Sequence, residues 1–269
     1  MDFIAKTCVS TEAMNIRIKH KHELNKMRHS AAILHEVLNL LIPKAKAGVT
    51  TLELDEFAEK HIRKRGGLPA FKGVRGKRPY PATLCISIND EVVHGIPGPR
   101  RLKDGDIVSI DCGVIWREYY SDAAITLGIG NISPEAEKLM DATKRALQAA
   151  IELCRPGNHI GDISHAIQTA VEGAGFNVVR DLYGHGIGKF LHEDPPIHNF
   201  GKAGEGHEIL PGMAVAIEVM SCQFGYTTIT LDDYWTVKTA DGGLSAHFED
   251  TVVVTKAGPE NITKINAPP

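Results

Sequence analysis

Apolar positions in the first part of the chain repeat at helical spacing. Over residues 23–41 they recur every three or four positions, which predicts an amphipathic helix. A second helix is predicted to begin after Thr50, because Glu53 lies three residues further on and completes a capping box. This helix ends at Gly66 and Gly67. The Gly-, Pro- and Lys/Arg-rich residues 67–81 then read as a loop.

Apolar stretches with strand-like patterns follow, and two more helices separate them. A long helix is predicted from Ser133-Pro134 to about Cys154, and a shorter one over 162–172. The predicted strands cover 84–89, 107–115, 119–127, 178–181, 213–220, 234–238 and 246–254.

The order helix, helix, strands occurs twice, and short matches suggest a duplicated half. Residues 105–111 and 212–218 both read Gly-x-x-Val-x-Ile-acid, at nearly the same offset as a match between 48–66 and 157–175. Duplication predicts one α/β (α+β) domain with pseudo-twofold symmetry around a central cleft. We expect an N-terminal arm over 1–20, this domain over 21–260 and a C-terminal tail over 261–269.

Composition and charge exclude several classes of protein. The formal net charge of −3 gives no general attraction to DNA or to an anionic membrane. No apolar run approaches a membrane span, and the N-terminus lacks an apolar signal-like core. The five cysteines are scattered and form no C-x-x-C pair, which favours a reducing, cytoplasmic location. The chain has 13 His against 8 Phe, so the positions of the histidines matter.

Two carboxylates are predicted to face each other across a hairpin. Asp111 ends an apolar strand and Asp122 lies in the next one. A hairpin centred between Trp116 and Arg117 would place them directly opposite, with Cβ atoms about 4.5–5.5 Å apart. Two carboxylates at that distance repel each other unless a cation lies between them. The pair therefore favours a metal site.

The second half of the chain offers matching residues. Glu218 lies in a strand that is apolar on both faces, and Glu249 precedes another apolar strand. His94, His185 and His192 are each flanked by or close to glycine or proline. Four carboxylates and one imidazole suit two divalent ions such as Mn, Fe, Co or Zn better than a soft-metal site.

The sequence lacks the motifs of several other classes of enzyme. The segment 184–188 lacks the spacing of G-x-G-x-x-G, and His192-Glu193 is followed by prolines rather than by the second histidine of a zincin helix. There is no P-loop and no G-x-S-x-G. The basic stretches within 63–78 and 100–103 are typical of a solvated surface; contact of 63–78 with ribosomal RNA is the weaker interpretation.

The motifs together identify a family resemblance over about 16–256. The segments that carry it are 87–97, 106–111, 121–123, 184–188, 192–195, 216–218, 235–239 and 244–249. In these segments the chain resembles type I methionine aminopeptidases, and only 30 residues separate Glu218 from Glu249, too few for the helical insert of the type II enzymes.

The resemblance implies the pita-bread fold and a dinuclear metal centre. It assigns five metal ligands and two histidines, His94 and His192, on the substrate side. The residue before His192 is commonly Phe in this family, whereas this chain has Leu191, and the basic loop keeps only Tyr80 of the aromatic residues often found there. The implied ligands are Asp111, Asp122, His185, Glu218 and Glu249.

The resemblance also implies a mechanism and a substrate. Glu218 is the expected general base for a metal-activated water, and His192 and His94 are expected to donate hydrogen bonds to the peptide. The substrates are nascent polypeptide N-termini with a small second residue, and the expected state is a monomer. The expected methionine pocket comprises Tyr80, Cys85, Leu191 and Trp235.

Alternatives stay open at this point. A prolidase or proline aminopeptidase would share the fold and ligands but carries a sizeable N-terminal domain, for which the short arm leaves no room. A non-catalytic binding protein of the same fold would lose ligands. A metal-free carboxylate pair of the glycosidase type would resist EDTA. Cys85 as a nucleophile would need a histidine partner, and none is visible in the sequence.

Overall fold

The computed structural model describes residues 15–264. Most of the predicted N-terminal arm, residues 1–14, and the end of the predicted tail, residues 265–269, lie outside the described residues. From residue 15 to residue 20 the chain contacts the second half of the protein, where the Lys19 amide donates to the Gly212 carbonyl at 2.8 Å.

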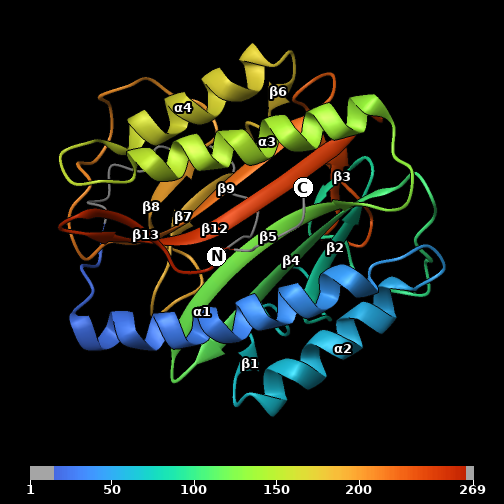
Figure 1. Cartoon of the computed structure of the whole chain (residues 1–269), viewed down its shortest axis with the longest axis horizontal. Helices are drawn as coiled ribbons and strands as arrows, with labels where there is room; N and C mark the ends of the chain where they lie inside the picture. Colours follow the sequence, from blue (N-terminus) through green and yellow to red (C-terminus); the bar gives the residue numbers. More distant parts are fainter. Residues whose placement is uncertain (1–14, 265–269) are drawn as a thin grey trace.

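Within 15–264, four α-helices cover one side of a large antiparallel sheet (Figure 1). The helices are α1 (Lys21–Leu41), α2 (Thr51–Lys64), α3 (Pro134–Leu153) and α4 (Ile160–Gly173), with one 3-10 turn, η1 (Ile42–Lys44).

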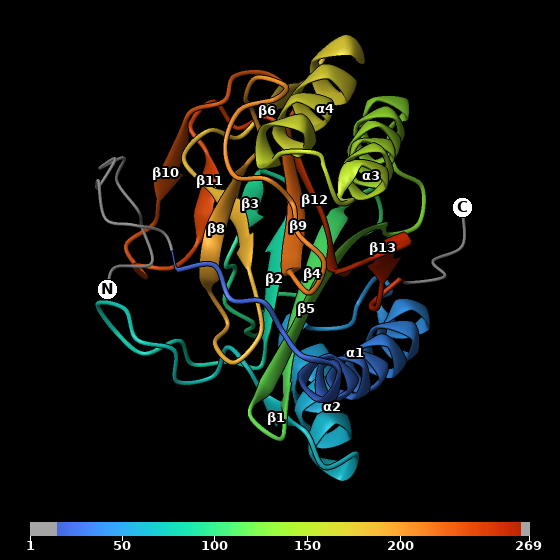
Figure 2. The ribbon, with the colours of Figure 1, turned by 90° about the vertical axis from the view of Figure 1, so that its left-hand side faces the viewer.

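The large sheet contains ten strands, and a small three-stranded sheet lies beside it (Figure 2). The large sheet follows the order β1-β4-β5-β12-β9-β7-β8, with β2 paired to β4, β6 to β9 and β13 to β12, and the small sheet follows β10-β11-β3. The strands are β1 (Leu68–Pro69), β2 (Leu84–Ile88), β3 (Glu91–Val93), β4 (Ile107–Trp116), β5 (Tyr119–Gly128), β6 (Asn177–Val178), β7 (Tyr183–Gly186), β8 (Glu193–His198), β9 (Ala214–Cys222), β10 (Thr228–Thr230), β11 (Val237–Thr239), β12 (Ser245–Thr255) and β13 (Gly258–Asn261).

Side-chain caps set the starts of two helices where the sequence predicts them. Thr50 caps α2, since its hydroxyl accepts from the Glu53 amide at 3.1 Å while the Glu53 carboxylate accepts from the Thr50 amide at 2.7 Å. Ser133 caps α3 by accepting from the Ala136 amide at 3.2 Å. The predicted capping box of α2 is therefore confirmed.

The two halves of the described chain repeat one arrangement. In the first half α1 packs on β4 and β5, and in the second half α3 packs on β9 and β12. The shorter helices α2 and α4, which the repeat aligns, have 14 residues each. The halves join where β5 meets β12, near the middle of the sheet in Figure 1. This agrees with the predicted α+β fold and its internal duplication, although one continuous sheet connects the halves.

The hairpin between β4 and β5 differs from the prediction. Its turn residues are Arg117 and Glu118, both at positive φ, so Asp122 pairs with Gly113 and Asp111 pairs with Ala124. A two-residue turn of this kind usually carries Asn or Gly, and Arg-Glu gives no such signal. The two aspartates are therefore diagonal neighbours on one face, not directly opposite.

Other differences concern short strands. The predicted strand over 234–238 is shorter and begins at Val237, because Tyr234 adopts a positive φ of 68° and Asp233 accepts hydrogen bonds from the amides of Trp235 and Thr236. The strand predicted over 178–181 is reduced to β6. Strands β1, β3, β7, β8, β10 and β13 were not predicted, and β1 lies within the predicted loop 67–81.

Among the residues that the structure describes, no helix is both long enough and apolar enough to cross a membrane.

Candidate functional site

One row of cross-strand partners crosses the large sheet and carries three of the predicted ligands. Asp111 on β4 pairs with Ala124 on β5, Ala124 pairs with Glu249 on β12, and Glu249 pairs with Glu218 on β9. Residues directly opposite on neighbouring strands lie on the same face of a sheet. The intervening residues of β4 pack with α1 in the apolar core. The three carboxylates therefore point away from the helices.

The other two predicted ligands lie one pleat away from this row. Asp122 precedes Ala124 by two residues on β5, and His185 on β7 pairs with Ala216, two residues before Glu218. Alternate residues of a strand share a face. All five predicted ligands therefore face the same side.

Glycines on either side of His185 allow the strands to approach closely. A Cβ atom on Gly184 would lie 2.5 Å from the Ala216 carbonyl oxygen, and one on Gly186 would overlap the Asp194 carbonyl oxygen. Glycine at these two positions therefore lets β7 pass close to β9 and β8.

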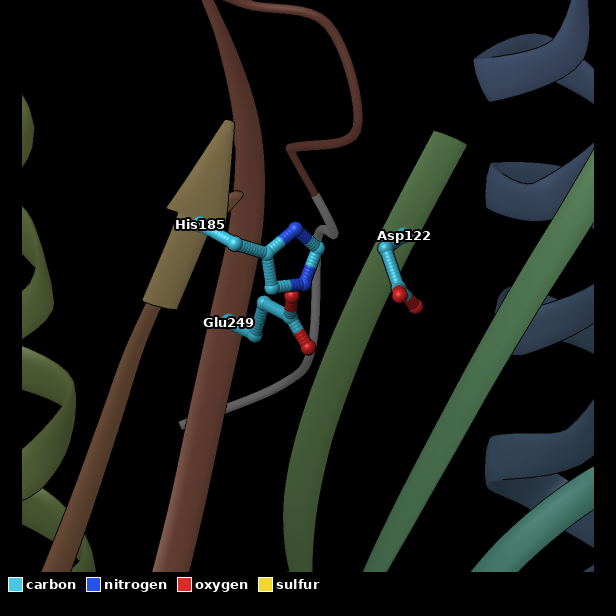
Figure 3. Close-up of side chains that lie close together, drawn as sticks. All are labelled: Asp122, His185 and Glu249. Atoms are coloured by element: carbon cyan, nitrogen blue, oxygen red, sulfur yellow. The ribbon is translucent and has the colours of Figure 1, made fainter. Parts of the chain in front are cut away.

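Figure 3 shows three of these side chains converging from separate strands. Asp122, His185 and Glu249 each offer one ligand atom, and these atoms lie within 4.8 Å of one another. All three residues are buried. We call Asp111, Asp122, His185, Glu218 and Glu249 the ligand cluster.

Burial raises the pKa of every carboxyl group in the ligand cluster. The pKa of Asp111 rises to about 7. The pKa values of Asp122, Glu218 and Glu249 are well above their ordinary range, through burial and then the charge of a neighbouring aspartate. Four carboxyl groups at such short range cannot all ionise without a compensating positive charge.

The residues fit divalent metal ions. Buried carboxylate oxygens of three cluster members, Oδ1 of Asp111, Oδ1 of Asp122 and Oε1 of Glu249, have no hydrogen-bond partner. Buried polar groups are normally paired, so such atoms indicate a missing partner. Carboxylate oxygens and an imidazole nitrogen are the donors that Mn, Fe, Co and Zn accept.

The histidines of the site are buried, which lowers the pKa of each. The pKa falls to about 4 for His185 and His94 and to about 3 for His192. The rings of His185 and His192 meet edge to face, with centroids 4.4 Å apart. A neutral imidazole can bind a metal through one nitrogen or donate a hydrogen bond through the other.

His94 is held in an unusual backbone conformation. Its φ is +60°, in the left-handed region. A Cβ atom on the following residue, Gly95, would overlap the Ile86 carbonyl oxygen. The backbone therefore passes close to β2 here and sets the direction of the imidazole.

Tyr80, Cys85, Leu191 and Trp235, which we call the apolar wall, border the same cavity as the ligand cluster. The Tyr80 hydroxyl donates to the Leu84 carbonyl at 2.9 Å, and the Trp235 indole N–H donates to the Arg78 carbonyl at 3.0 Å. The rings of Tyr80 and Trp235 meet edge to face at 5.1 Å. These contacts fix the two large aromatic groups of the wall.

The structure thus brings every predicted site residue into one cavity and adds others. The two predicted substrate-side histidines, His94 and His192, are among the residues that line this cavity. The sequence reasoning assigned no role to His247, which shares a strand face with Glu249 because it lies two residues earlier on β12. That spacing could have revealed it. The apolar residues it missed, which had no strand or helix signal, are Phe71, Val74 and Val93.

Known proteins resemble this chain over nearly its whole length. Residues 25–256 match the model of metallopeptidase family M24. The methionine aminopeptidase of Clostridium perfringens is 52% identical over 250 residues, covering 93% of this chain and 99% of that protein. Methionine aminopeptidase 1 of Bacillus subtilis is 44% identical over 250 residues, covering 92% of this chain and 98% of that protein.

Solved structures also resemble this chain. The methionine aminopeptidase of Thermotoga maritima superposes with a TM-score of 0.90 at 39% identity, covering 93% of this chain and 99% of that one. The prolidase of Pyrococcus furiosus matches with a TM-score of 0.74 at 22% identity, and this chain covers 66% of it, so that likeness shows the fold alone. With a pita-bread fold, a buried cluster of ligands and matches over nearly its whole length, the chain belongs to metallopeptidase family M24.

Proposed function

We propose that the protein removes the N-terminal methionine from nascent proteins and peptides whose second residue is small. One observation carries this proposal: the ligand cluster and the apolar wall border the same cavity. The methionine aminopeptidases at 44–52% identity support the same activity. Hydrolysis at one end of the cavity and a site for an apolar side chain at the other are what such a reaction needs.

We propose that the ligand cluster holds two divalent cations. Its members are Asp111, Asp122, His185, Glu218 and Glu249, and Co, Mn, Fe and Zn all suit their donors. When bound, the cations would lower the pKa of a coordinated water and polarise the scissile carbonyl.

Glu218 is the proposed general base. Its carboxylate would take a proton from the attacking water and pass it to the leaving amine. His192 and His94 border the same cavity, and a neutral imidazole carries one N–H. Each would donate a hydrogen bond to the peptide, where negative charge develops on the carbonyl oxygen.

The apolar wall would hold the methionine side chain. Leu191 and Cys85 are buried and offer small apolar surfaces, while Tyr80 and Trp235 supply ring faces and edges. Burial raises the pKa of the Cys85 thiol well above its usual value, so the thiolate that a nucleophile requires is disfavoured. Cys85 is therefore a wall residue in this proposal rather than a nucleophile.

A peptide assay on metal-loaded protein tests the proposal. We expect release of free methionine from Met-Ala-Ser and none from its N-acetylated form, because the free amine is needed in an exopeptidase. Ala-Pro-Ser is the control for proline-directed cleavage. Faster cleavage of Ala-Pro-Ser would favour the prolidase alternative, and no cleavage of any peptide would favour a non-catalytic member of the family.

Three predictions about partners and location stay proposals. The four cysteines in the described residues are free and buried, consistent with a reducing, cytoplasmic location. Arg63 and Lys72 both form ion pairs with Glu59. This pairing leaves less positive charge in 63–78 for contact with the ribosome. Sedimentation with ribosomes tests that contact, and light scattering tests the monomer prediction.

A further inference from the structure

His247 lies on β12 beside the ligand cluster and is only 2% exposed. Its Nε2 atom is buried and has no hydrogen-bond partner. It borders the cavity together with the cluster. A buried imidazole nitrogen without a partner is costly, so its position needs an explanation.

The backbone of His247 is fixed from the neighbouring strand. Its amide donates to the Thr126 hydroxyl oxygen at 2.9 Å, and the Thr126 hydroxyl lies 2.8 Å from the His247 carbonyl oxygen. The ring therefore enters the cavity from a rigid position on the sheet.

The ring nitrogen lies equally far from two cluster carboxylates. Nε2 of His247 is 3.7 Å from Oε2 of Glu218 and 3.7 Å from Oε2 of Glu249. Both separations exceed a normal N–H···O hydrogen bond. A side-chain adjustment of less than 1 Å in either glutamate would bring it within reach, since hydrogen bonds form at about 2.7–3.2 Å.

We propose that His247 is a positioning residue of the metal centre, whose Nε2–H donates to Glu218 and Glu249 when these carboxylates hold cations. This inference rests on one part of the proposed function, the binding of metal by the ligand cluster, and does not depend on the peptide substrate. Carboxylates that bind a metal through one lone pair keep others for such donors, and these partners orient the ligands. The two glutamates are cross-strand partners, so one donor between them fixes both.

Calorimetric titration of metal-free protein with Mn²⁺, without substrate, tests this. In His247→Leu the Mn²⁺ affinity is expected to fall by about 10–100-fold, the usual cost of removing such a partner. In His247→Gln the side-chain amide can still donate, and the affinity is expected to stay within about threefold, far from that 10–100-fold loss. The thermal unfolding of each metal-free variant shows whether its fold is intact.

His198→Leu is the matched control. His198 also has a buried ring nitrogen without a partner, but it lies outside this cavity, so Mn²⁺ affinity should not change. If His247→Leu does not fold, His247→Asn replaces it, because the shorter amide cannot reach both glutamates and should weaken binding.

The outcomes separate this inference from the proposed function. Unchanged affinity in His247→Leu would show that the ring only packs. Equal loss in His247→Leu and His247→Gln would show that the ring is a direct ligand instead of a donor. Absence of Mn²⁺ binding by the wild-type protein would overturn the metal centre as well, whereas a wild-type protein that binds Mn²⁺ but cleaves no methionyl peptide would overturn the proposed function alone.

Discussion

The ligand cluster and the apolar wall border one cavity but are built differently. Every member of the cluster lies on a strand of the large sheet, where backbone hydrogen bonds fix its position. Three members of the wall, Tyr80, Leu191 and Trp235, lie in connections between strands. Rigid strands hold groups that must meet a cation at set distances, while loops can vary without disturbing the sheet. The difference implies that substitutions in the ligand cluster abolish the reaction, whereas substitutions in the apolar wall alter which peptides are cleaved.

The largest effect is expected from the cluster. Glu218→Gln keeps the size of the side chain but removes the proposed base, so hydrolysis of Met-Ala-Ser should fall by roughly 10³-fold or more. Release of methionine measures it, and thermal unfolding checks the fold. A variant with wild-type activity would remove Glu218 from the mechanism.

A histidine at the border between the two regions should have the next effect. His192→Ala would remove a hydrogen bond to the developing negative charge, and kcat should fall by about 10²–10³-fold with Mn²⁺ affinity unchanged. Steady-state kinetics and calorimetry on the same preparation provide both values. A change confined to metal affinity would instead place His192 among the ligands.

Metal binding should release protons from the carboxyl groups of the ligand cluster and not from the apolar wall. Burial raises the pKa of Asp111 to about 7 and holds those of Asp122, Glu218 and Glu249 well above their usual range, so the metal-free protein retains protons at neutral pH. A cation needs the ionised carboxylates, and the affinity should therefore rise with pH, roughly tenfold per pH unit for each proton released.

Calorimetry in buffers of different ionisation enthalpy counts those protons. Leu191→Ala is the control, because the wall contributes no titrating group to the cation. An observed heat that does not depend on the buffer would contradict the raised pKa values.

The smallest effect is expected from the wall. Leu191→Ala would remove apolar contact with the methionine side chain, and kcat/KM for Met-Ala-Ser should fall by about tenfold, within the range for lost methylene contacts. Mn²⁺ affinity should stay unchanged. A large loss of Mn²⁺ affinity in this variant would show that wall and cluster are not independent.

The same difference explains what the sequence could predict. Asp111 and Glu218 interrupt apolar strands, where an unpaired charge is conspicuous, and the strand pattern alone marked them. The position of Asp111 relative to Asp122 depends on a turn at Arg117-Glu118 whose residues carry no turn signal, so the predicted register of this hairpin was wrong by one pleat. An even shift preserves the face of a strand, which is why the carboxylates still converge.

The wall could not be derived in this way. Leu191 and Trp235 lie outside strands, and their approach to the cavity depends on long-range contacts such as the bond from the Trp235 indole to the Arg78 carbonyl. Only the family resemblance pointed to them. His247 shows the opposite case, because its spacing from Glu249 was visible in the sequence and its meaning emerged only from the distances.

The central claim is that hydrolysis depends on cations held by the ligand cluster. Mn²⁺ titration of metal-free protein, with bound metal and methionine release followed in one sample, tests it most directly. We predict no hydrolysis without metal, activity that rises in step with bound Mn²⁺, and loss of both in Asp122→Asn. Full activity in the metal-free protein, or undiminished Mn²⁺ binding in Asp122→Asn, would contradict the claim.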